Sequence, residues 1–187
     1  MADHITSPAS PPPRRTPPAG DRDGWRAFGA AVRDAVGDRD PVAIIAATPR
    51  TIAALVDGVR PDRLARPESD GRWSARDVIA HLADCEILYG WRVRQVLTRV
   101  APPLDAIDQD AWAACMRAAG VDVTTALASL TAQRAMHVPL LRSLTAADLA
   151  RTGVHGERGP ETLASMIRLW AGHDLFHLEQ LHRILAQ

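Results

Sequence analysis

The sequence contains no lysine, so all 22 of its basic residues are arginines, and 22 acidic residues bring the formal net charge to zero. A nucleic-acid-binding surface or a polybasic membrane-binding surface needs a clear cationic excess, which this chain lacks. We therefore expect neither a nucleic-acid partner nor a membrane partner. The 187 residues suffice for one ordinary domain, and an apolar fraction of 47% can form a real core.

Cysteine is scarce, and long apolar runs are absent from the sequence. Cys85 and Cys115 lie far apart, which is neither a disulfide framework nor a zinc-knuckle spacing. We expect both to be small buried residues in a reducing compartment. No apolar run reaches transmembrane length, and the N-terminal segment has no hydrophobic signal core. These absences predict a cytoplasmic protein.

Composition divides the chain into three segments. Residues 1–21 are rich in Pro, Ser, Ala and Arg. Such a segment cannot bury enough apolar surface to offset its chain entropy, so we predict a disordered Pro-rich tail. Residues 22–40 predict an accessory N-terminal helix, because apolar residues recur at helical spacing from Trp25 to Val36. Residues 41–187 are expected to form the main domain.

Helical periodicity dominates this main domain. Thr48 and Pro49 are typical of an N-cap and a first helical residue, so they predict a mid-length helix over 49–59. Three long helices are predicted over about 75–99, over about 123–143 and in the last segment from Thr162. Pro139 is expected to kink or reset the second of these, and a shorter helix is expected near Trp112.

No alternating pattern predicts a strand of useful length. Ser74 and Asp77 form a capping-box-like pair at the start of the helix over 75–99. Four antiparallel helices around one core are the economical arrangement of these elements. The predicted fold is therefore all-α: an up-down four-helix bundle with an extra short N-terminal helix.

Three histidines lie on the apolar faces of two long helices. At about 100° per residue, His173 and His177 share the middle of the apolar stripe of the last helix, and His81 lies on an inward line of the helix over 75–99. A lone buried imidazole is usually a core residue with a hydrogen-bond partner. In a pair, each unsatisfied ring nitrogen would cost about 1–3 kcal/mol, and one metal ion would satisfy both rings. Spacing alone favours the two interpretations equally.

The other four histidines carry weaker signals. His4 lies in the tail, His155 in a predicted flexible loop, and His182 away from the apolar stripe. His137 is ambiguous, because Pro139 interrupts its helix. We predict no site role for them.

Four segments of the chain, over roughly residues 41–187, carry a resemblance to a known family: TPRTIAALVDGV, RWSARDVIAHLADCE, PLDAIDQDAW and GHDLFHLEQL. In their order and spacing they resemble the DinB/YfiT-like superfamily of metal-binding four-helix bundles. The resemblance implies a divalent metal held by His81, His173 and His177. Zinc, nickel, iron and manganese are all compatible with such a set of ligands.

The family includes thiol-dependent S-transferases that use mycothiol, bacillithiol or glutathione, so we predict this activity on small electrophiles or metabolites. A thiol bound to a dipositive centre would lose its proton, and the thiolate is the reactive nucleophile. With water in place of the thiol, the same centre would suit a metal-dependent hydrolase. A non-catalytic, stress-related metal- or ligand-binding bundle is the third interpretation, and a homodimer is a further expectation.

Four more residues are candidates for the wall of a small-molecule pocket: Asp84, Arg92, Trp112 and Gln180. Arg92 lies on the same helix face as His81 and could receive a carboxylate of the thiol cofactor or substrate. Alternatively, it could pair with Asp108 or Asp110 of the following loop. Asp84 could orient an imidazole or point to the edge of the bundle.

Overall fold

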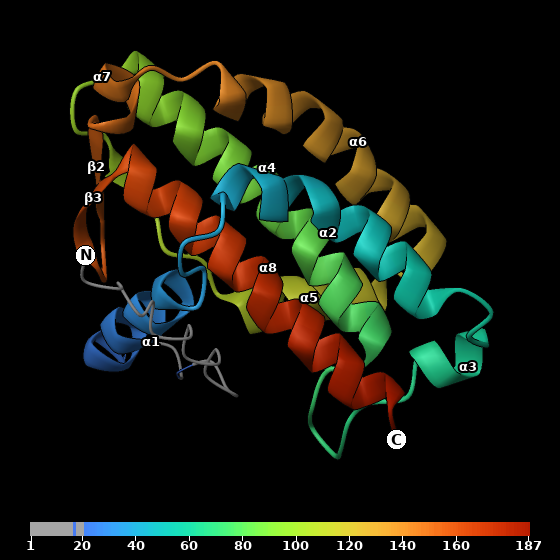
Figure 1. The fold of residues 1–187 in the computed structure, drawn as a ribbon. Coiled ribbons are helices and arrows are strands. Elements are labelled where there is room, and N and C mark those ends of the chain that lie inside the picture. Colours follow the sequence, from blue (N-terminus) through green and yellow to red (C-terminus); the bar gives the residue numbers. More distant parts are fainter. Residues whose placement is uncertain (1–16, 18–20) are drawn as a thin grey trace, which may run out of the picture.

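Four helices pack around the core of the molecule: α2 (Pro41–Val56), α4 (Ala75–Thr98), α6 (Val123–Arg142) and α8 (Leu163–Leu185). Figure 1 shows them in the computed structural model, which describes residue 17 and residues 21–187. The shorter helices are α1 (Arg22–Asp34), α3 (Pro61–Leu64), α5 (Gln109–Ala118) and α7 (Ala146–Leu149). The predicted disordered tail, residues 1–21, lies almost entirely outside the described residues. None of the described helices combines the length and the hydropathy needed to cross a bilayer.

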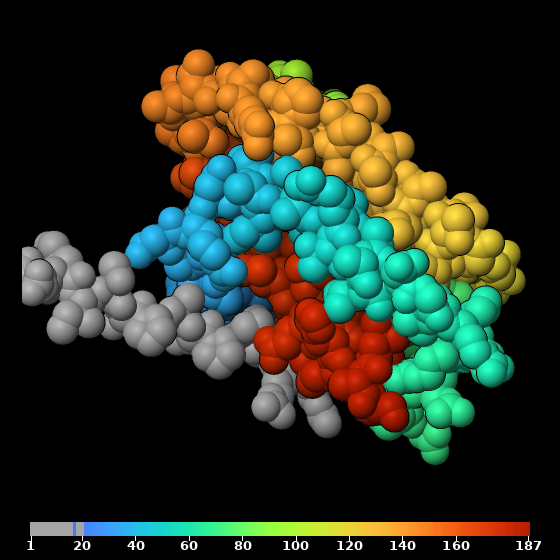
Figure 2. All heavy atoms as spheres, turned by 45° about the vertical axis from the view of Figure 1, so that its right-hand side comes forward, coloured from blue at the N-terminus to red at the C-terminus, as the bar shows by residue number. Residues whose placement is uncertain are grey.

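The structure confirms a four-helix bundle with an extra N-terminal helix, and it adds the order of the helices. Both α2 and α4 pack against α6 and against α8. In Figure 1, α4 and α6 run in the same direction, from lower right to upper left, and α2 and α8 run in the opposite one. Helix directions therefore do not simply alternate along the chain. Figure 2 shows α2, in cyan, between α6 in yellow to orange and α8 in red. Because α4 and α8 are antiparallel neighbours, their inward residues face one another.

Helix α4 begins where the sequence predicts. The Ser74 hydroxyl accepts a hydrogen bond from the Asp77 N–H at 3.2 Å, and the Asp77 carboxylate accepts one from the Ser74 N–H at 2.9 Å. This reciprocal capping box satisfies two N–H groups that an uncapped helix would leave without partners. It fixes the first turn, and His81 and Cys85 follow one and two turns later.

Helix α2 begins at Pro41, so the predicted start at Pro49 is wrong. The Asp40 carboxylate caps the helix by accepting a backbone N–H at 2.9 Å, and Pro41 occupies the first turn. Pro49 lies inside the helix and has no N–H to donate to the Ile45 carbonyl. The guanidinium of Arg134, from α6, donates to that carbonyl instead. A contact with another helix thus lets α2 continue through a proline.

Three short strands lie at one end of the bundle: β1 (Pro103–Leu104), β2 (Thr152–His155) and β3 (Gly159–Thr162). The sheet order is β1-β2-β3, in which β1 pairs with β2 in parallel and β2 pairs with β3 in antiparallel fashion. The sequence allows only a small extended piece in the loop over residues 147–161, because segments of two to four residues are too short to show an alternating pattern. His155, predicted in a flexible loop, is instead buried at the end of β2.

Helix α1 packs against the side of α8 at a glycine. A Cβ atom on Gly172 would lie 1.8 Å from the carbonyl oxygen of Val32, so only glycine allows this approach. Beside it, the rings of Phe28 and Phe176 pack edge to face, with centroids 5.3 Å apart. This contact places α1 next to His173, the residue that follows Gly172.

Candidate metal centre

The antiparallel helices α4 and α8 bring the three predicted histidines together. The Nε2 atom of His173 lies 3.2 Å from Nε2 of His81 and 3.1 Å from Nε2 of His177. All three side chains are buried. The i, i+4 spacing on α8 places two of the rings on one face, and the capped α4 presents the third opposite them.

These three nitrogens suit a shared cation better than they suit one another. A neutral imidazole carries one N–H, so Nε2 of His173 cannot form a full hydrogen bond with Nε2 of both His81 and His177. In a tetrahedral site with metal–nitrogen distances of about 2.0–2.1 Å, the nitrogen ligands lie about 3.3 Å apart. The observed spacings of 3.1 and 3.2 Å are close to that value. The residues present therefore fit a divalent metal.

Burial keeps the three imidazoles neutral. It lowers the pKa of His81 and His173 well below the usual 6.5, and the neighbouring rings lower both further. Burial lowers the pKa of His177 to about 4, although its hydrogen bond to Gln180 acts in the opposite direction. Neutral rings offer lone pairs to a cation and would leave it its full positive charge.

Gln180 orients one of the rings. Its side-chain oxygen accepts a hydrogen bond from Nδ1 of His177 at 2.9 Å. With the ring proton on Nδ1, the lone pair of Nε2 points toward His173. Gln180 was predicted on the pocket wall, but it is not among the residues that line the cavity described below. It contacts a histidine instead and would hold that ring in place.

Cys85 lies beside the histidines, which the sequence interpretation missed. Its sulfur is 3.4 Å from Nε2 of His81. Together with His81 and His173 it forms a buried group whose donor atoms all lie within 4.8 Å of one another, as in a metal site. Burial raises the pKa of the thiol. The available signal was the spacing of Cys85, four residues after His81 on the same helix.

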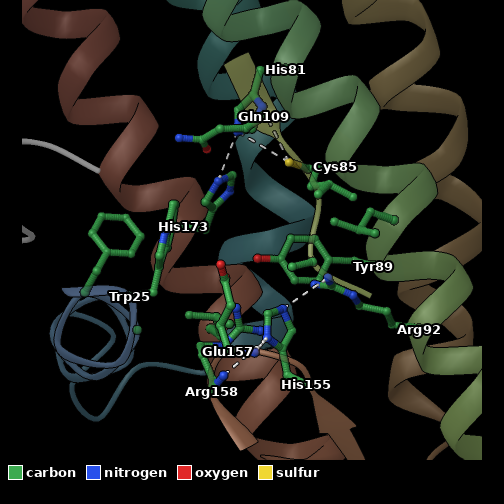
Figure 3. A pocket seen from close by; sticks show the side chains of 16 residues that line it. Trp25, His81, Cys85, Tyr89, Arg92, Gln109, His155, Glu157, Arg158 and His173 are labelled. Atoms are coloured by element: carbon green, nitrogen blue, oxygen red, sulfur yellow. Dashed lines mark hydrogen bonds between the residues drawn. The ribbon is translucent and has the colours of Figure 1, made fainter. Parts of the chain in front are cut away.

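A cavity of about 80 Å³, open to solvent, leads to this group. Figure 3 shows its two ends, with Tyr89 between them. One end holds His81, Cys85 and His173, and the other holds Arg92, His155 and Arg158, while α1 contributes Trp25 and Phe28 to the wall.

Arg92 is the predicted pocket residue that does line the cavity. It does not pair with Asp108 or Asp110: Asp108 caps α5, and Asp110 accepts the indole N–H of Trp73 at 3.1 Å. Its guanidinium donates instead to the backbone carbonyl of Asp105. Sequence alone could not place that carbonyl, because the loop after β1 determines its position.

Asp84 and Trp112 are not among the residues that line the cavity. Asp84 is largely buried, and burial raises its pKa to about 6. Trp112 lies in α5 and is partly buried.

The fold and the donor group define a histidine-rich four-helix bundle suited to a divalent metal. The chain belongs to the DinB superfamily, whose sequence model matches residues 44–181. A relative from Geobacillus kaustophilus, named "Putative metal-dependent hydrolase GK0616", is 28% identical over 141 residues, which span 75% of this chain and 79% of the relative. YfiT from Bacillus subtilis, with the same kind of name, is 26% identical over 141 residues, with the same coverage.

A solved structure has the same fold. It is that of YfiT from Bacillus subtilis, described as "a probable metal-dependent hydrolase with an unusual four-helix bundle topology". It matches with a TM-score of 0.72 and 23% identity, over 92% of this chain and 90% of that one.

Proposed function

We propose that this protein is a metal-dependent, thiol-dependent S-transferase, with His81, His173 and His177 as the metal ligands. The observation that carries the proposal is the approach of Nε2 of His173 to Nε2 of both His81 and His177, where His81 and His173 line a cavity open to solvent. Zinc, nickel, iron and manganese are the candidate metals. Mycothiol, bacillithiol and glutathione are the candidate thiols.

When bound, a divalent cation there would acidify a thiol or a water molecule at an open position, so that either becomes a nucleophile at neutral pH. The protein would supply the rest of the reaction environment. The cavity walls from α1 and α4 would hold the electrophile against the thiol, which supplies proximity. The thiolate sulfur would bond to the electrophilic carbon, and the leaving group would depart with the electron pair of the broken bond.

Sulfur transfer asks less of the surrounding residues than hydrolysis does. A thiol bound to a divalent cation would already lose its proton, so it needs no general base, whereas hydrolysis gains about 10²–10⁴-fold from one. Metal-dependent hydrolysis is the second candidate, because relatives carry that name. Glu157, the carboxylate that lines the cavity, would be its base.

The metal site is tested by elemental analysis of protein purified under metal-replete conditions. We expect about one metal ion per chain in the wild type and a loss of most of it in His81→Ala, His173→Ala and His177→Ala. The matched control is His182→Ala, which changes an exposed histidine on the same helix as His173. Equal metal content in all five proteins would contradict the site.

The reaction is tested with the metal-loaded protein, each candidate thiol and 1-chloro-2,4-dinitrobenzene as a model electrophile. We expect adduct formation above background with at least one thiol, and none with His81→Ala. Glu157→Gln separates the candidates: S-transfer should persist in it, whereas hydrolysis of a model ester should fall by about 10²-fold or more. Metal binding without either activity would support the non-catalytic interpretation.

A further inference from the structure

The end of the cavity away from the histidines is built around a cation with no acidic partner. Arg92 is 5% exposed, and its Nε atom is buried without a hydrogen-bond partner. Among the residues that the structure describes, no aspartate or glutamate forms an ion pair with it. The acceptor of its Nη2 group is a neutral backbone carbonyl, that of Asp105. Burying an unpaired cation costs several kcal/mol, so a native site of this kind calls for an anion.

The neighbouring arginine does not share this feature. Arg158 forms two hydrogen bonds of 2.9 Å with the carboxylate of Glu161, which also pairs with Arg33. Glu161 thus forms its ion pairs with other arginines and none with Arg92. Three arginines here, Arg33, Arg92 and Arg158, face two carboxylates, those of Glu161 and Glu157, so an excess of one positive charge remains.

His155 adds a second polar group without a matching acceptor. Its Nδ1 atom faces the backbone N–H groups of Glu157 and Arg158 at 3.2 and 3.4 Å, and its Nε2 atom lies 3.3 Å from Nη2 of Arg92. Donors therefore surround both ring nitrogens. A neutral imidazole has one N–H and one acceptor, so whichever nitrogen holds the proton, one set of donors faces another.

We propose that this end of the cavity binds the carboxylate of a small organic acid, with Arg92 and His155 as its recognition residues. A carboxylate oxygen between the guanidinium and the imidazole would accept from both and supply the missing negative charge. One uncompensated cation matches a monoanion better than a phosphate monoester, which carries a charge of about −1.5 to −2. The rest of the acid would extend past Tyr89 toward the histidines (Figure 3).

This inference rests on the proposed function in one respect: if that function holds, the acid bound here is the substrate or the thiol cofactor. Binding itself does not need the metal. The experiment therefore uses chelator-treated protein and calorimetric titration with acetate, phenylacetate and benzoate, each beside its uncharged amide. We expect the wild type to bind at least one acid on the order of 10-fold or more tightly than the matching amide. Equal affinity for acids and amides would overturn the proposal without any mutant.

Variants locate the contact. Arg92→Gln should weaken binding of the preferred acid on the order of 10- to 100-fold and leave amide binding unchanged. Arg94→Gln is the matched control, since Arg94 is on the same helix but exposed and outside the cavity. Unchanged acid binding in a folded Arg92→Gln protein would overturn the proposal. Because the titrations use chelator-treated protein, loss of the metal function and loss of this site are separate results.

Discussion

Two buried side-chain atoms among the described residues have no hydrogen-bond partner: Nδ1 of His173 and Nε of Arg92. Both residues line the same cavity, one at each end. Buried polar groups are otherwise satisfied throughout this core, including the ion pairs of Arg134 with Glu86 and Asp174. At the residue scale, the exceptions to ordinary packing therefore coincide with the candidate site.

The Gln180 side chain provides the first prediction at this scale. Gln180→Leu removes the acceptor on Nδ1 of His177, so the ring loses the contact that fixes its tautomer and orientation. We expect metal affinity to fall about 10- to 100-fold, measured by competition with a chromophoric chelator. Gln180→Glu keeps an acceptor at the same place and should retain tight binding. Equal affinities for both variants would show that the contact does not support the ligand.

The pH dependence of stability provides the second prediction at the residue scale. Burial, aided by Arg158 and Arg92, lowers the pKa of His155 to about 3, whereas it is about 6.5 in an unfolded chain. The unfolded chain therefore binds more protons below pH 6.5. The contribution of neutral His155 to the free energy of unfolding is therefore fully present above pH 6.5, and it is lost as the pH falls toward 3.

His155→Gln should remove about 1.4 kcal/mol per pH unit from the slope of the unfolding free energy between pH 6 and 4. Urea denaturation of chelator-treated wild type and variant, at several pH values, measures it. Parallel slopes for the two proteins would contradict the assignment.

At the scale of elements, the contact of α1 with α8 depends on a single hydrogen atom. Replacing a helical glycine with alanine usually stabilises a helix by about 1 kcal/mol. At Gly172 the added methyl would meet the Val32 carbonyl, so we expect Gly172→Ala to destabilise the protein by about 1–3 kcal/mol and to displace α1. Thermal unfolding measures the sign. Gly156→Ala is the control, because a Cβ atom there meets nothing within 4 Å.

Elements whose signals are local could be predicted, and elements that depend on distant contacts could not. The capping pair of Ser74 and Asp77 and the long apolar stripe predicted α4, and the i, i+4 spacing predicted the inward pair of α8. The start of α2 was misplaced, because the partner of the Ile45 carbonyl is Arg134, 89 residues away in sequence. β1 forms by pairing with β2, which lies far away in sequence, and the β2–β3 hairpin around His155 is too short to show an alternating pattern.

For the whole molecule, metal binding should stabilise the native state. The proposed ligands come from two helices, so the cation would bind the folded chain and not the unfolded one. At a free metal concentration about 100 times Kd, this adds about 2.7 kcal/mol, or roughly 5–10 °C in Tm. Differential scanning fluorimetry with and without chelator checks it. His81→Ala should show no such dependence, and a chelator shift of equal size in that variant would argue against these ligands.

Contacts between distant parts of the molecule also determine how much of the site could be predicted from the sequence. The three histidines could be placed because their helices are long and periodic. Arg92 was recognised as a candidate, but its partners could not be, since they come from the loop after β1 and from β2. The cavity itself is a product of α1, α4 and the sheet together, and no single segment encodes it.

The division of the donor residues between two distant helices has a consequence for damaged chains. His81 and Cys85 lie on α4, whereas His173 and His177 lie on α8, and 92 residues separate His81 from His173. A proteolytic cut in any connection between them leaves two donors on each fragment, which is too few for a closed site. If these residues hold the metal, release of the ion reports loss of chain integrity, and two fragments that reassemble should regain it together.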